Sequence, residues 1–137
     1  MAREGCAAVY DLDIDDENTR ELGRIGGCDA VVKALKAFGG TDKDVACKGC
    51  WAVANLAVDV EHKRELGRVG ACDTVVKALK AFGGTDKDVA QEGCAAVYNL
   101  AAYDAENKRA LLAAGATTAV KASLGCEFKR QALEILN

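Results

Sequence analysis

The stretch ELGRIGGCDAVVKALKAFGGTDKDVA, residues 21–46, returns as ELGRVGACDTVVKALKAFGGTDKDVA at residues 65–90, with three positions changed. The two copies lie 44 residues apart, and a diverged third copy, KRALLAAGATTAVKASL at residues 108–124, arrives one residue late. Self-similarity at a fixed period of this length is typical of solenoids, in which each unit buries its apolar face against its neighbours. The repeat therefore predicts a stacked array of similar units.

The apolar residues within each copy have the spacing of helices. The chain contains no proline, and no alternating β-branched run suggests a strand, so we expect an all-α architecture. Three helices fit in one period: a short helix at 61–69 that Gly70 ends, a second helix at 73–82, and a long third helix. Because FGGTDKD has the composition of a turn, we expect Thr85 or Asp86 to cap the third helix.

The third helix is the most informative element of the repeat. On a helical wheel one stripe is apolar and is formed by Val45, Gly49, Val53, Leu56 and Val60. A glycine at the phase of Gly49 recurs in all three copies, although glycine costs a helix interior about 1 kcal/mol relative to alanine. We therefore expect a close helix crossing there. Trp51 and Asn55 fall opposite the stripe, where an indole serves as a binding anchor or is covered by the next third helix.

The period also divides the chain into units. We expect one domain over residues 1–137, with a lone third helix at 1–16, one repeat at 17–59, a second at 60–104, and a diverged terminal repeat at 105–137. Because a solenoid needs polar caps on its outer units, apolar residues at the first helix suggest either association with another chain or a piece of a longer array.

The order of short helix, two glycines, second helix, turn and long third helix resembles the armadillo repeat, with the HEAT repeat as the near alternative. The stretches GRIGGCDAVVKAL and GCWAVANLA carry this resemblance. WAVAN is similar to the Trp-x-x-x-Asn signature of importin-α-like and β-catenin-like peptide-binding solenoids. The resemblance implies a right-handed α-solenoid of three-helix repeats, whose third helices line a concave groove that holds an extended peptide. Asparagines of that groove contact the peptide backbone, and tryptophans hold the stems of basic side chains.

Carried onto this sequence, the resemblance assigns Asn55 and Asn99 to the asparagine ladder, with Asp11 at the same position of the first copy. Trp51 alone matches the tryptophan position, since alanine replaces it in the other copies. The remaining expected contacts are aromatic residues, acidic residues and one thiol at the groove edge: Tyr10, Tyr98, Asp15, Asp59 and Cys47. An amide offers one donor and one acceptor to a peptide unit, so several repeats must act together.

The aspartates give the expected groove a negative sign. An acidic, partly aromatic groove favours a cationic extended segment, with a cation–π contact at Trp51 worth about 0.5–2 kcal/mol. The alternative is that these aspartates are solvated helix ends. The net charge of −3 provides no global basic field, so nucleic acid is not expected as a partner.

The cysteines and the single histidine do not form a site of known chemistry. Seven cysteines is an odd number, and most recur at equivalent repeat positions, so we expect reduced core thiols. The CKGC pair lies inside a helix without a second pair, and no metal, cofactor or enzymatic function is expected.

The sequence has no membrane-spanning apolar run and no leader, so we expect a protein of the cytoplasm or nucleus with no membrane partner. The leading hypothesis is a non-enzymatic protein–protein interaction module that binds an extended, basic peptide. The alternatives are a self-associating scaffold, either a homodimer or an end-to-end stack, and a fragment of a longer array without a ligand of its own.

Overall fold

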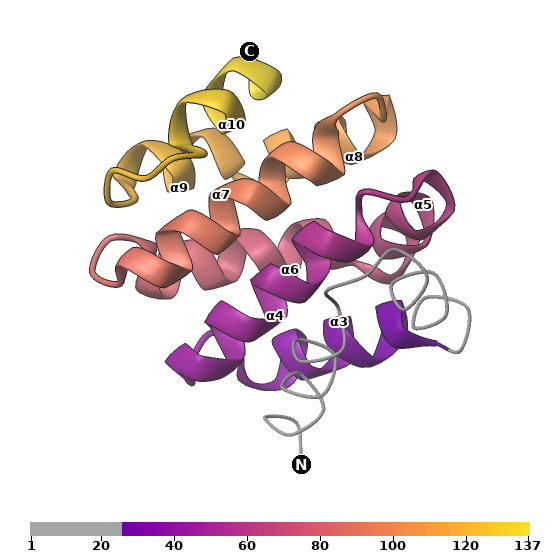
Figure 1. The fold of residues 1–137 in the computed structure, drawn as a ribbon, viewed down its shortest axis with the longest axis horizontal. Helices are drawn as coiled ribbons and strands as arrows, with labels where there is room; N and C mark the ends of the chain where they lie inside the picture. Colours follow the sequence, from indigo (N-terminus) through magenta and orange to yellow (C-terminus); the bar gives the residue numbers. More distant parts are fainter. Residues whose placement is uncertain (1–25) are drawn as a thin grey trace.

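The computed structural model describes residues 26–137. Its helices follow one another as a stack of antiparallel layers (Figure 1), and no strand occurs within these residues. The elements are α3 (Gly27–Phe38), α4 (Lys43–Leu56), α5 (Val60–Val69), α6 (Ala71–Ala78), the π-helical turn η1 (Leu79–Gly83), α7 (Lys87–Ala101), α8 (Ala105–Ala114), α9 (Ala116–Ala122) and α10 (Lys129–Leu136). The chain is therefore an all-α solenoid, as the repeat predicts.

Aspartates begin four of these helices. The side chains of Asp42, Asp59, Asp86 and Asp104 accept hydrogen bonds from backbone N–H groups in the first turns of α4, α5, α7 and α8. Such capping satisfies donors that have no partner within the helix. Of the two capping residues expected for the third helix, Asp86 is the one used, and its carboxylate accepts from Val89 N at 2.9 Å.

Glycine ends the short first helix of each unit. Gly70 and Gly115 have φ of +102° and +91°, a left-handed conformation that other residues rarely adopt. The end of α5 at Gly70 was predicted. The second helix starts two residues earlier than expected, because Gly70 also serves as the residue before α6, and its last turn widens into η1.

The apolar stripe of α4 is buried over most of its predicted length. Val45, Val53 and Leu56 are at most 1% exposed. Val60 was assigned to the same stripe, and this prediction is wrong: α4 ends at Leu56, and Val60 begins α5 with 60% of its surface exposed. The cause is Asp59, whose side chain caps the new helix and so interrupts the old one.

The close crossing predicted at the repeated glycine is present in both described copies. An added Cβ on Gly49 would lie 2.5 Å from Leu35 Cδ2, and one on Gly93 would lie 2.4 Å from Leu79 Cδ2. Real Cβ atoms do not approach carbon this closely, so only glycine fits against these buried leucines. Each glycine therefore allows the second helix of a unit to pack closely against the third helix of the same unit.

Polar side chains join one unit to the next. Asn107, which is 5% exposed, donates from Nδ2 to Lys63 O and Leu100 O at 3.1 Å each. Lys80 Nζ donates to Ala114 O at 3.0 Å. A cation near the last carbonyls of a helix also interacts favourably with the helix dipole.

The described cysteines agree with the prediction of core thiols. Cys28, Cys72 and Cys94 are buried and free, and burial raises the pKa of each thiol to about 12. Cys47 and Cys126 are half-buried. No helix among residues 26–137 combines the length and the apolar character needed to cross a bilayer.

Candidate functional site

The candidate site is the exposed side of the third helices. Helix α4 packs along α7, and α7 packs along α10; the three cross the side of the stack that faces the viewer in Figure 1. We define the third-helix surface by the exposed and half-buried residues of α4 and α7: Lys43, Asp44, Cys47, Lys48, Trp51 and Asn55 of α4, and Lys87, Asp88, Gln91, Glu92, Tyr98 and Asn99 of α7. Apart from Trp51 and Tyr98, each member has an equivalent 44 residues away in the other set.

The two asparagines assigned to the ladder both lie on this surface, and both are half-buried. Asn99 Nδ2 donates to Ala54 O at 2.8 Å. The bond ties α7 to the backbone of α4, so one of the two N–H donors of this amide is engaged within the chain. A primary amide has a second N–H and a carbonyl oxygen with two lone pairs, which are the groups a peptide backbone would meet.

Trp51 and Tyr98 bring aromatic area to the same surface. Both side chains are half-buried, so Trp51 is neither fully solvated nor fully covered by the next third helix. Its position between Cys47 and Asn55 on consecutive turns of α4 follows from helical spacing. The indole therefore stands between the thiol end and the amide end of the surface.

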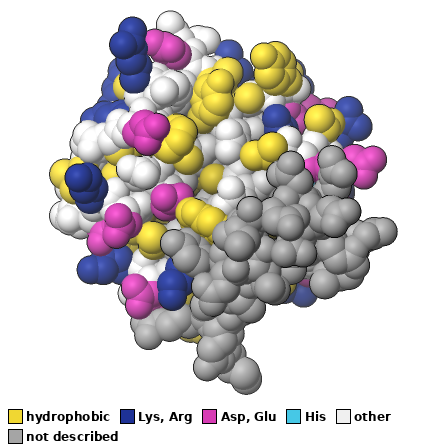
Figure 2. Space-filling model, viewed as in Figure 1, with side chains coloured by type: hydrophobic (Ala, Val, Ile, Leu, Met, Phe, Trp, Pro, Cys, Tyr) yellow, Lys and Arg dark blue, Asp and Glu magenta, His cyan; other side chains and the backbone are white. Residues whose placement is uncertain are grey.

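Carboxylates and lysines alternate around the first turns of α4 and α7, where Asp44 and Asp88 stand beside Lys43 and Lys87. Burial raises the pKa of the Cys47 thiol, and the nearby charges of Asp88, Glu92, Asp86 and Asp44 add to this effect, so that the pKa is about 11. Figure 2 shows acidic and basic side chains interspersed on the left of this face, toward those first turns. The thiol therefore lies in a negative field, which disfavours the thiolate.

Sequence reasoning missed Asp88 and Glu92 of this acidic group, and Glu92 is the more buried of the two. It is half-buried, and burial together with the neighbouring charge of Asp88 raises the pKa of its carboxyl. The signal was present, since Glu92 lies 44 residues after Lys48 and thus on the same helix face. Lys43 Nζ lies 3.6 Å from Asp86 Oδ2 and offsets part of the negative charge.

The other predicted site residues have different surroundings. Asp59 Oδ1 accepts from Glu61 N at 2.9 Å and His62 N at 3.1 Å, so this aspartate caps α5. Tyr10, Asp11 and Asp15 lie outside the described residues.

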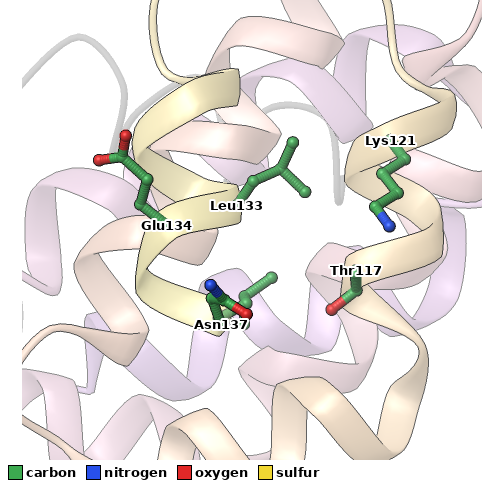
Figure 3. Close-up of a pocket in the computed structure, with 6 residues that line it drawn as sticks. Thr117, Lys121, Leu133, Glu134 and Asn137 are labelled. Atoms are coloured by element: carbon green, nitrogen blue, oxygen red, sulfur yellow. The ribbon is translucent and has the colours of Figure 1, made fainter.

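The described part of the chain has no metal-binding cluster, and an open pocket lies away from α4. Among residues 26–137 no group of three or more His, Cys, Asp or Glu side chains is arranged to hold a metal ion. Cys47 and Cys50 of the CKGC pair differ in burial, the first half-buried and the second fully buried on α4. An open pocket of about 360 Å³ lies between α9 and α10, away from α4 (Figure 3).

Solved structures of designed proteins share this architecture. The designed armadillo repeat protein YIII(Dq)4CqI superposes with a TM-score of 0.79 at 28% identity, over 99% of this chain and 58% of that one. The designed armadillo repeat protein YIII(Dq.V1)4CPAF, in complex with the peptide (KR)4, gives a TM-score of 0.77 at 27% identity, over 98% of this chain and 57% of that one. No protein-family model and no curated protein sequence matches the chain.

These superpositions show that the chain has the armadillo-repeat fold that the sequence resembles. Both matched proteins are longer, and this chain spans little more than half the length of each.

Proposed function

We propose that this armadillo-fold chain is a non-enzymatic interaction module, cytoplasmic or nuclear, that binds an extended basic peptide along the third-helix surface. The observation that carries the proposal is the negative field around Cys47, to which Asp88 and Glu92 contribute, beside Trp51 on the same surface. A cationic side chain placed over the indole would meet those carboxylates. The solved complex of a protein of this fold with (KR)4 supports the choice of a basic peptide.

The amides supply the backbone contacts in this proposal. Asn99 is oriented by its bond to Ala54 O, so its remaining polar groups need little ordering on binding. Two amide hydrogen bonds of about 0.5–1.5 kcal/mol each and one cation–π contact of about 0.5–2 kcal/mol sum to about 1.5–5 kcal/mol. Because about 4 kcal/mol corresponds to a millimolar dissociation constant, binding by these contacts alone should be weak.

The test is a titration with (KR)4, with an acidic peptide (DE)4 of equal length as the ligand control. Weak binding is best followed by NMR chemical-shift changes at two salt concentrations, because screening reduces attraction between exposed charges. We expect (KR)4 to bind, salt to weaken it, and Trp51→Ala to weaken it about threefold to tenfold. Tyr103→Ala is the matched control, since Tyr103 is a fully exposed aromatic residue in a turn outside the third-helix surface.

Glu92 provides a second test through pH. A bound cation favours the ionised carboxylate, so affinity should increase as the pH rises through and above 4.5, the ordinary pKa of a glutamate, because the pKa of Glu92 is raised. Glu92→Gln should weaken binding at neutral pH and flatten this dependence. Equal affinity of wild type and Trp51→Ala, or equal binding of the acidic peptide, would rule the proposed site out.

A further inference from the structure

Three residues on one face of the second helix of a unit form a stripe, and the first helix of the next unit packs against it. In α6 and η1 the stripe is Cys72, Val76 and Lys80, which lie four residues apart and so share one helix face. Cys72 Sγ donates to Asn107 O at 3.8 Å, and Lys80 Nζ donates to Ala114 O at 3.0 Å. Val76, between them, is 1% exposed. Both ends of the stripe therefore contact α8, and its centre is covered.

The preceding unit repeats this arrangement 44 residues earlier, with Cys28, Val32 and Lys36 on α3. Cys28 Sγ donates to the carbonyl of His62 at 3.9 Å, and Val32 is 1% exposed. Lys36 Nζ lies 3.3 Å from the position that a Cβ would take on Gly70, at the end of α5. Helix α5 therefore packs against the same three residue types.

The last unit differs at all three positions. Counting 45 residues on from the α6 stripe gives Thr117, Lys121 and Gly125. Thr117 is half-buried, while Lys121 and Gly125 are exposed, and nothing lies within 4 Å of the position of a Cβ on Gly125. A buried apolar centre has become a lysine. The helix is also shorter, because α9 ends at Ala122, so Gly125 lies beyond it and no lysine continues the stripe toward a following helix.

We infer that the α8–α10 unit is a capping unit, whose outer face is built to remain in water. Stacking another unit of the internal kind here would bury the Lys121 ammonium at a position where the internal units have a buried valine, and burying a charge costs several kcal/mol. It would also leave the last carbonyls of the docked helix without a hydrogen bond of the kind that Ala114 O accepts from Lys80 Nζ. Solenoids require such polar faces on their outer units.

The open pocket lies on this outer face. In Figure 3 the side chain of Lys121 projects from α9 toward α10, and Leu133 faces it from α10. The lining combines apolar and polar side chains: Thr117, Lys121, Leu133, Glu134, Leu136 and Asn137. A face that mixes these groups around an open pocket offers a stacked helix no continuous apolar stripe. The inference is independent of the proposed peptide binding, which concerns α4 and α7.

The experiment joins a copy of residues 58–104 after Asn137, so that the added first helix keeps its Asp59 cap, and asks whether the added unit docks. It compares the wild-type chain with Thr117→Cys/Lys121→Val, which restores the two positions of the stripe that lie on α9. Hydrogen exchange read by mass spectrometry reports protection of the added first helix. We expect protection there at least tenfold higher on the restored stripe than on the wild type.

The matched control places the same residue types on exposed positions of the same unit, as Thr118→Cys/Arg109→Val. The internal residues equivalent to these two positions are exposed too, so the control should not increase protection. Circular dichroism of each variant without the added unit verifies that the host chain is folded. Equal protection of the added unit on wild type and restored chain, whether high or low, would overturn the inference.

Discussion

Replacing Gly93 by alanine tests the close crossing that holds each unit together. The new Cβ would lie 2.4 Å from Leu79 Cδ2 and 2.7 Å from Leu79 Cγ, and Leu79 is 2% exposed, so the leucine has little space into which it can move. Overpacking of this kind costs about 1–3 kcal/mol, whereas replacing glycine by alanine in a helix interior gains about 0.5–1 kcal/mol. The clash should win, and we expect a net loss of about 1 kcal/mol in the free energy of unfolding.

The sign of this effect should reverse when Leu79 is shortened. Leu79→Ala alone costs about 2–5 kcal/mol, but it removes the atoms that the new Cβ would meet. In that background Gly93→Ala should therefore stabilise the protein by about 0.5–1 kcal/mol, as helix propensity predicts. The double-mutant cycle then gives a coupling energy of about 2 kcal/mol, which is in the range measured for residues in contact.

Urea unfolding measures these changes, with far-UV circular dichroism and the fluorescence of Trp51 as two probes. A shift of the midpoint at constant slope reports stability, and coincidence of the probes verifies that the units unfold together. Gly40→Ala is the control, because a Cβ on Gly40 would meet nothing within 4 Å, and its effect should stay within about 0.5 kcal/mol. If Gly93→Ala proves as stable as wild type, the repeated glycine does not serve packing and the reasoning fails.

Three further predictions use other features. Because burial and nearby carboxylates raise the pKa of Cys47 from 9.0 to about 11, its alkylation at pH 8 should be about a hundredfold slower than that of an unperturbed thiol; peptide mapping by mass spectrometry should show a faster rate in Asp88→Asn. Tyr103→Gly should raise the melting temperature by relieving the left-handed φ of 58°, a strain of about 1–2 kcal/mol, whereas Tyr103→Ala should not. Asn107→Leu removes two buried hydrogen bonds and should cost about 1–3 kcal/mol in urea unfolding; an unchanged midpoint would contradict this.

The features that the sequence predicts are those that depend only on residues within one unit. The glycine at position 49 and the helix of which it forms part follow from periodicity, because a packed helix face repeats every three to four residues. The assignment of Val60 failed because a cap at Asp59 outweighs a continuing apolar pattern. The bond from Asn99 to the preceding unit and the burial of Glu92 depend on contacts between α4 and α7, which the spacing of residues along one helix does not contain.

The bonds between units have a consequence for how such a chain changes over evolutionary time. Lys80, Asn99 and Asn107 all donate to backbone carbonyl groups of a neighbouring unit, and every residue carries such a carbonyl. A duplicated unit can therefore attach to its neighbour before any side chain has adapted to it. Individual side chains on the exposed surface, Trp51 among them, are then free to diverge while the joints remain intact.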